Sequence, residues 1–303
     1  MSDVWAIDTD RLSKRYGTFD AVRAVDLKVA RRGITGFLGR NGAGKSTTIK
    51  MLLGMIRPTS GAGRVIGRRI DDRAEHLEMR RRVAYVAEDK QTYAYMTVAQ
   101  MIRFTRSFYA DWRPDLERRL LDEYALPPTR RVKALSKGMR TKLALLLALA
   151  RRPELLILDE PSEGLDPVSI EELLQTLVAT AADGTTIFFS SHQIVEVERI
   201  ADRVCILDQG RLVADVSLDY MRQEYRRITI GFAGEPPMAA FRVPGVEHVR
   251  ASGRQIDVIA SANAQAIVEE ARRAAAVSVE VVPIGLRDLF LEKVQHGERD
   301  ERP

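Results

Sequence analysis

The stretch that decides the fold of this chain is Gly39-Arg40-Asn41-Gly42-Ala43-Gly44-Lys45-Ser46, which fits the pattern G-x-x-x-x-G-K-[ST]. It follows the β-type run Gly33–Leu38 and precedes a helical run that starts at Thr47. Glycines let such a loop curl until its N–H groups converge on phosphate oxygens, and the helix N-terminus adds partial positive charge. We therefore predict a nucleoside triphosphate site in this phosphate-binding (Walker A) loop, with Lys45 at the β- and γ-phosphates and Ser46 on Mg²⁺. The predicted binding residues are Gly39, Arg40, Asn41, Gly42, Ala43, Gly44, Lys45, Ser46 and Thr47.

A second acidic strand end supports this site. The apolar run Leu155–Leu158 leads directly into Asp159 and Glu160. We expect Asp159 to help hold Mg²⁺ and Glu160 to orient and deprotonate the water that attacks the γ-phosphate. An acidic pair after a strand is weak evidence for a catalytic site by itself, and the phosphate loop upstream is what supports this interpretation.

The pattern around these motifs predicts an α/β fold. From residue 5 to about 216, short β-type runs alternate with helical patterns, as in an α/β sheet domain. The runs Leu155–Leu158 and Thr185–Ser190 are continuously apolar or β-branched, which is typical of buried parallel strands. Residues 97–152 are mostly helical in pattern, with Thr97 as an N-cap, and predict a helical insertion into the sheet domain.

Length and composition indicate two domains. A chain of 303 residues has room for about two domains. Near Tyr220 the pattern changes to three alternating runs, at 228–232, 256–258 and 277–281, which predict half-buried strands, with an Ala-rich helix at 262–275 between the last two. We place an ATP-binding domain at 1–218 and a small α/β (α+β) accessory domain at 219–303. The accessory domain carries no phosphate, metal or nucleophile signature, so regulation or support of a dimer is the expected role.

Charge, cysteine content and hydropathy indicate which partners and which cellular compartment to expect. The net charge of +5 is mild and dispersed, and we expect no nucleic-acid partner. Cys205 is the single cysteine, which excludes an internal disulfide and a cysteine zinc site and favours the cytoplasm. The longest apolar stretch, Leu143–Ala150, is far shorter than the roughly 20 residues of a membrane helix.

Five ordered motifs carry a family resemblance over residues 5–216. They are the phosphate loop, Leu135-Ser136-Lys137-Gly138-Met139, Leu158-Asp159-Glu160-Pro161, Gly164-Leu165-Asp166 and Ser191-His192. In content and order they closely resemble the ATP-binding-cassette (ABC) ATPases, P-loop NTPases with an inserted helical subdomain. The resemblance implies that Ser136 and Gly138 bind the γ-phosphate of ATP on a second subunit, and hence a homodimer or heterodimer. A helix start with a hydroxyl and a glycine is physically suited to an anion.

The resemblance also assigns three further residues. His192 is expected to contact the γ-phosphate. Glu88 stands where the family usually has a Gln that senses Mg²⁺ and the attacking water, so Glu88 is a candidate catalytic and metal residue, with Gln91 as the fallback. Tyr16 occupies the position of the aromatic ring that stacks on adenine.

The Ser-Lys-Gly-Met variant of the signature resembles bacterial exporter ATPases of the ABC-2 type. The expected function is that of the ATP-binding and hydrolysing subunit of an exporter, on the cytoplasmic face of the membrane, with the transmembrane permease on a separate chain. The segment from Glu88 to Phe108, with Tyr93, Tyr95, Met96, Met101 and Phe104, is expected to receive a helix of that permease, although some of these side chains also suit the core of the insertion. Two alternatives remain open. One is a soluble ABC ATPase of DNA repair, chromosome or translation work, and the other is a nucleotide-gated switch without turnover.

Overall fold

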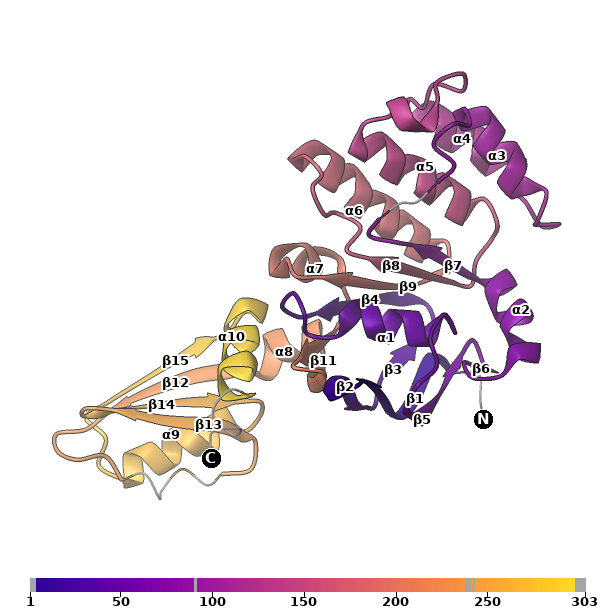
Figure 1. The fold of residues 1–303 in the computed structure, drawn as a ribbon. Coiled ribbons are helices and arrows are strands. Elements are labelled where there is room, and N and C mark those ends of the chain that lie inside the picture. Colours follow the sequence, from indigo (N-terminus) through magenta and orange to yellow (C-terminus); the bar gives the residue numbers. More distant parts are fainter. Residues whose placement is uncertain (1–3, 90–91, 238–240, 242, 298–303) are drawn as a thin grey trace. The chain divides into compact units, whose positions relative to one another are not determined.

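The chain forms two compact units, Met1–Asp215 and Val216–Pro303. The computed structural model describes residues 4–89, 92–237, 241 and 243–297 (Figure 1). The boundary predicted from the sequence, after residue 218, lies three residues from this division. Each unit is described by itself below.

A six-stranded sheet forms the centre of the first unit. Its strand order is β11-β10-β4-β9-β8-β7, and the strands from β10 to β7 pair in parallel. The predicted buried runs form β8 and β9, in which every residue is buried. The bounds are β4 Gly33–Leu38, β7 Val83–Val86, β8 Leu155–Asp159, β9 Thr186–Ser191, β10 Arg203–Asp208 and β11 Arg211–Ser217.

A second sheet, which the sequence pattern did not distinguish from the first, is antiparallel. It has the order β2-β1-β5-β6, with β3 also paired to β1. Helix α1 lies between the two sheets (Figure 1), and its Ile49, Met51 and Leu52 join apolar residues from both sheets in one buried core. The strands are β1 Trp5–Tyr16, β2 Phe19–Val25, β3 Lys28–Ala30, β5 Ser60–Val65 and β6 Arg68–Arg69, and the helices of this region are α1 Lys45–Leu52, α2 Arg73–Arg82, α6 Pro167–Ala182 and α7 Ile194–Ile200.

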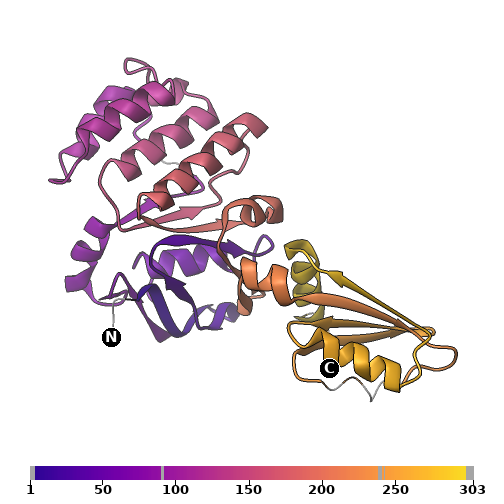
Figure 2. The same ribbon diagram turned by 180° about the vertical axis from the view of Figure 1, so that it is seen from behind.

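The predicted helical insertion is present as a group of helices on one side of the parallel sheet (Figure 2). It contains α3 (Val98–Arg106), α4 (Pro114–Glu123) and α5 (Lys137–Leu149). Thr97 is confirmed as the N-cap of α3, where its hydroxyl accepts a hydrogen bond from the Gln100 N–H at 3.2 Å. The caps fix where these helices start and therefore where the loops before them lie.

The second unit is a four-stranded antiparallel sheet with helices. The strand order is β13-β14-β12-β15, and α9 packs on the apolar face formed by Ile228, Ile230, Ile256 and Val258. Three of these strands, β12, β14 and β15, were predicted from the sequence pattern, whereas β13 was not, because it is mostly half-buried or exposed and has little apolar alternation. The bounds are α8 Leu218–Glu224, β12 Arg226–Gly231, β13 Val246–Ser252, β14 Gln255–Ala260, α9 Ala264–Arg273, β15 Ser278–Pro283 and α10 Leu286–Gly297.

Candidate functional site

The phosphate loop connects the end of β4 to the start of α1, and two of its glycines are sterically required. Gly44 has a φ of 106°, and a Cβ there would lie 2.4 Å from the Ala21 carbonyl oxygen. A Cβ on Gly39 would lie 2.5 Å from the Leu207 carbonyl oxygen. Only glycine lets the backbone pass this close to its neighbours. The loop thus presents its N–H groups at the start of α1, a position suited to phosphate.

Lys45 lies in the floor of the loop and is almost fully buried. Its Nζ donates to the Gly39 carbonyl at 2.7 Å and forms an ion pair with Glu160 Oε1 at 2.9 Å. A buried ammonium needs such anionic or carbonyl partners, because desolvation strongly disfavours an unpaired charge. The loop therefore holds a fixed positive charge at its centre.

Asp159 lies at the end of β8 beside Ser46. The Ser46 hydroxyl donates to Asp159 Oδ1 at 3.2 Å, and the Ser190 hydroxyl of β9 donates to the same oxygen at 2.7 Å. Hard oxygen donors of this kind, a hydroxyl and a carboxylate, are the ligands that Mg²⁺ prefers. The neighbouring side chains fit the sequence prediction that Ser46 and Asp159 form a magnesium site.

Glu160 follows directly and contacts His192. Glu160 Oε2 accepts the His192 backbone N–H at 3.2 Å and lies 2.9 Å from His192 Nδ1. The backbone of Glu160 is left-handed, with φ 44°, and its N–H donates to the Ser190 hydroxyl at 3.0 Å. Strained backbone at a buried carboxylate is typical of functional sites. The buried carboxylate is thus aimed at a histidine and a lysine.

One cavity of about 450 Å³ brings most of the predicted residues together. Phosphate-loop residues line it together with three side chains from more distant segments, Glu88, Glu160 and His192. The phosphate-loop members are Arg40, Asn41, Gly42, Gly44, Lys45, Ser46 and Thr47. The fallback residue Gln91 lies outside the described residues. Phosphate-binding groups, a buried carboxylate and a histidine thus share a single space.

Three residues that line this cavity were not predicted from the sequence: Phe19, Ala21 and Glu163. Phe19 pairs with Tyr16 across the turn between β1 and β2 and is 61% exposed. Tyr16 is not among the lining residues, and Lys14 Nζ lies 5.1 Å from its ring centroid. Glu163 Oε2 lies 3.6 Å from His192 Nε2. Because Glu163 is in a loop, no periodic sequence pattern could have indicated it. Of these two aromatic residues, Phe19 lines the cavity and Tyr16 does not, and the adenine contact expected of Tyr16 stays a prediction.

The signature residues Ser136 and Gly138 lie elsewhere on the unit. Ser136 is the N-cap of α5, where its exposed hydroxyl accepts the Met139 N–H at 3.2 Å. Gly138 lies against Ser169, whose Oγ would be 2.8 Å from a Cβ at this position. Neither residue lines the cavity around Lys45. The sequence-based expectation that they act on a second subunit requires this separation.

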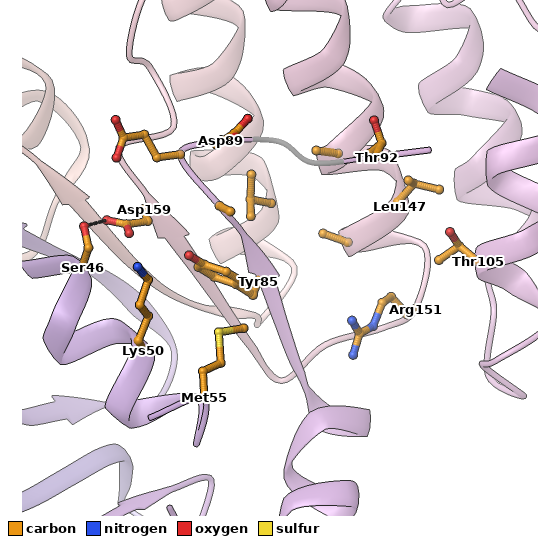
Figure 3. Close-up of a pocket in the computed structure, with 15 residues that line it drawn as sticks. Ser46, Lys50, Met55, Tyr85, Asp89, Thr92, Thr105, Leu147, Arg151 and Asp159 are labelled. Atoms are coloured by element: carbon orange, nitrogen blue, oxygen red, sulfur yellow. Dashed lines mark hydrogen bonds between the residues drawn. The ribbon is translucent and has the colours of Figure 1, made fainter. Parts of the chain in front are cut away.

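A second cavity of about 670 Å³ adjoins the first and shares Ser46 and Glu88 with it (Figure 3). Its walls come from α1, β7 and α5, with Lys50 and Tyr85 on one side and Leu147 on the other (Figure 3). Burial and the nearby Asp159 and Glu88 raise the pKa of Tyr85 to about 12, so the phenol stays neutral.

An exposed aromatic cluster lies on the helical insertion. Edge-to-face contacts join Tyr93 to Phe104 and Phe104 to Phe108, with ring centroids 5.3 Å and 5.1 Å apart. Tyr95 and Phe108 are about two-thirds exposed, whereas Met101 is only 8% exposed. The two roles expected of this segment therefore fall on different residues. Met101 packs in the core of the helical insertion, whereas the rings of Tyr93, Tyr95, Phe104 and Phe108 form an exposed surface.

Comparison with known proteins identifies the chain's relatives. Residues 22–163 match the family model described as "ABC transporter". The chain is 35% identical to the bacitracin transport ATP-binding protein BcrA of Bacillus licheniformis over 224 residues, which cover 73% of this chain and 72% of that protein. It is 35% identical to the Nod factor export ATP-binding protein I of Cupriavidus pinatubonensis over 214 residues, which cover 69% and 65%.

A solved ATP-binding subunit of an ABC transporter has the same fold, with a TM-score of 0.65 and 34% identity, covering 72% of this chain and 92% of the other. Among the residues that the structure describes, none of the helices has the length and apolarity needed to cross a membrane.

Proposed function

The chain belongs to the ABC transporter family as an ATP-binding and ATP-hydrolysing subunit, and from that premise we propose that it powers export through a transmembrane permease on a separate polypeptide. The observation that carries the proposal is the meeting of Lys45, Glu160 and His192 in one cavity with the phosphate loop. Export is the direction that one relative's name states. The working place of such a subunit is the cytoplasmic face of the membrane, beside its permease.

The chemistry follows from the groups in the cavity. The phosphate-loop N–H groups and the Lys45 ammonium bind the β- and γ-phosphates and stabilise the charge that develops during transfer. Glu160 accepts the proton of the attacking water, and His192 orients this carboxylate through the contact at 2.9 Å. In this proposal Glu88 lies at the same cavity as a further carboxylate.

The proposed magnesium site has two ligands from this chain. Ser46 and Asp159 would hold the ion, since their oxygens already lie together at 3.2 Å at the edge of the phosphate loop. When bound, Mg²⁺ neutralises phosphate charge and polarises the γ-phosphoryl group.

The proposed working form is a dimer in which Ser136 and Gly138 of one subunit complete the site of the other. The exposure of Ser136 and its separation from the Lys45 cavity support this arrangement. Because the Ser136 Oγ accepts the Met139 N–H, its own proton is available for a phosphate oxygen. The N-terminus of α5, a helix of thirteen residues, adds a favourable partial charge.

The proposed permease contact uses the cavity of Figure 3 and the aromatic cluster of Tyr93, Tyr95, Phe104 and Phe108. A short amphipathic helix laid into an apolar groove is a common recognition mode, and exposed aromatic rings are typical anchors for it. Because Glu88 and Ser46 line both cavities, a helix seated in the groove would touch the residues that face the nucleotide.

The catalytic proposal is tested with the purified chain and two variants. Glu160→Gln should bind ATP and lower kcat at least about 100-fold, as expected for loss of a general base. The matched control Glu171→Gln, at an exposed ion pair with Arg199, should hydrolyse ATP at the wild-type rate. A wild-type rate for Glu160→Gln would show that the assigned base is wrong.

The transport proposal is tested by membrane fractionation. The chain should stay in the cytosolic fraction when expressed alone and move to the membrane when co-expressed with a neighbouring gene for a multi-span permease. Replacement of Tyr95 and Phe108 by serine should abolish that recruitment while leaving ATP binding intact. A stable membrane-free complex with DNA or ribosomes would contradict the proposal.

A further inference from the structure

A buried carboxylate that takes no part in the proposed chemistry lies just behind the catalytic pair. Glu196, in the first turn of α7, is 5% exposed. Its Oε2 accepts the Ser162 hydroxyl at 2.7 Å and the Ser191 hydroxyl at 3.2 Å. Both serines are almost completely buried. A carboxylate is costly to bury, so its place between two hydroxyls needs an explanation beyond the stability of a short helix.

The two serines belong to the two segments that carry the catalytic groups. Ser162 follows Glu160 by two residues, on the loop that leads from β8 to α6. Ser191 is the last residue of β9 and immediately precedes His192. One oxygen of Glu196 therefore joins the loop of the proposed base to the strand end of the histidine. These segments come from neighbouring strands and meet near the start of α7 (Figure 1).

We infer that Glu196 is a positioning residue for ATP hydrolysis, which holds Glu160 and His192 in register by bonding Ser162 and Ser191 at once. This inference rests on the proposed roles of Glu160 and His192. The 2.9 Å contact between those two side chains depends on the relative placement of two loops. A shift of one loop by about 1 Å is enough to cost an enzyme about 100-fold in rate.

The electrostatic setting of Glu196 agrees with a bracing role. Burial, with a smaller contribution from the nearby Glu160, raises the pKa of Glu196, while the two serine hydrogen bonds oppose that rise. Its other oxygen, Oε1, is buried and has no hydrogen-bond partner among the residues that the structure describes. A glutamine keeps a carbonyl oxygen that can accept both serine hydroxyls, so Glu196→Gln should preserve the link between the two loops and most of kcat. Its NH₂ group, buried at the unpartnered Oε1 position, should instead lower the free energy of unfolding.

The test measures steady-state ATP hydrolysis by the full chain. Glu196→Ala should lower kcat about tenfold, as is usual when a supporting hydrogen-bond partner of an active site is lost, and leave KM for ATP within about twofold, because the phosphate loop is untouched. Glu196→Gln should retain at least about half of the wild-type kcat. The control Glu171→Ala should match the wild type.

A double-variant cycle separates positioning from a general loss of stability. If Glu196 acts through His192, then adding Glu196→Ala to His192→Ala should lower kcat by less than twofold more, since coupled residues are not additive. Ser162→Ala, which removes one donor and keeps the carboxylate, should lower kcat about threefold and provides the test if Glu196→Ala does not fold.

Three results would overturn the inference: a wild-type kcat for Glu196→Ala or Ser162→Ala, a tenfold loss for Glu196→Gln, or losses that multiply in the double variant. If instead Glu160→Gln hydrolyses ATP at the wild-type rate, the proposed base is wrong, which is a separate failure.

Discussion

Two glycines of the phosphate loop offer a matched pair for testing how the loop is built. Gly42 and Gly44 both have positive φ, at 83° and 106°, so replacement by alanine costs each about 1–2 kcal/mol of backbone strain. The gain from restricting the unfolded chain is also the same for both. Their surroundings differ: a Cβ on Gly42 meets nothing within 4 Å, whereas a Cβ on Gly44 would lie 2.4 Å from the Ala21 carbonyl oxygen.

The close approach sets the size of the expected difference. Ordinary contact begins at 3.4 Å, so Gly44→Ala must move a backbone carbonyl of β2 by up to about 1 Å. Overpacking of this kind costs a further 1–3 kcal/mol or so. We expect Gly42→Ala to lower the free energy of unfolding by about 1 kcal/mol and Gly44→Ala to lower it by about 3 kcal/mol.

Urea unfolding followed by tryptophan fluorescence measures this difference. Trp5 and Trp112 are the two tryptophans of the chain, and both lie in the first unit, so the signal reports on that unit. With an m-value of about 3 kcal/mol/M, the extra 2 kcal/mol or so lowers the midpoint by a further 0.7 M or thereabouts. Equal midpoints for the two variants, measured without nucleotide, would refute the steric argument.

Two further predictions concern ionisable groups outside the cavity. Hydrogen bonds from Arg82 and Arg31 lower the pKa of Glu154. The stability that this carboxylate contributes is therefore present above its unfolded pKa and is lost as the pH falls through the lower folded pKa. In urea unfolding at pH 7 and pH 4, Glu154→Gln should lose less stability between the two pH values than the wild type does, and an equal loss would contradict the assignment. Burial raises the pKa of the Cys205 thiol well above its usual range, so at pH 8 a disulfide reagent such as DTNB should react with it only at the rate of unfolding, and rapid labelling of the native chain would show that the thiol is accessible.

The sequence was most informative where a motif is local. The phosphate loop, the strand that precedes it and the acidic end of β8 are each specified within a few consecutive residues, so the positions of Lys45, Ser46 and Asp159 followed directly. Continuous apolar runs likewise predicted β8 and β9, because strands buried on both faces have no polar alternation.

The rest of the site depends on contacts between distant segments. Phe19 reaches the cavity because the turn after Tyr16 returns the chain, and no local pattern distinguishes the two rings. Glu196 resembles an ordinary acid in the first turn of a helix until the fold brings Ser162, thirty-four residues earlier, within hydrogen-bond distance. Strand β13 was missed because an edge strand with one polar face carries few apolar residues.

The ion pair between Lys45 and Glu160 affects how variants of this protein should be used as reagents. A γ-phosphate and the Glu160 carboxylate are rival anions for one ammonium, which the structure places 2.9 Å from the carboxylate. Replacing Glu160 with glutamine removes the rival together with the base, so a turnover-deficient variant should reach half-saturation at a lower ATP concentration than the wild type. Affinities measured on such a variant would overstate those of the native subunit. Titrations of the wild type with a non-hydrolysable analogue avoid this bias.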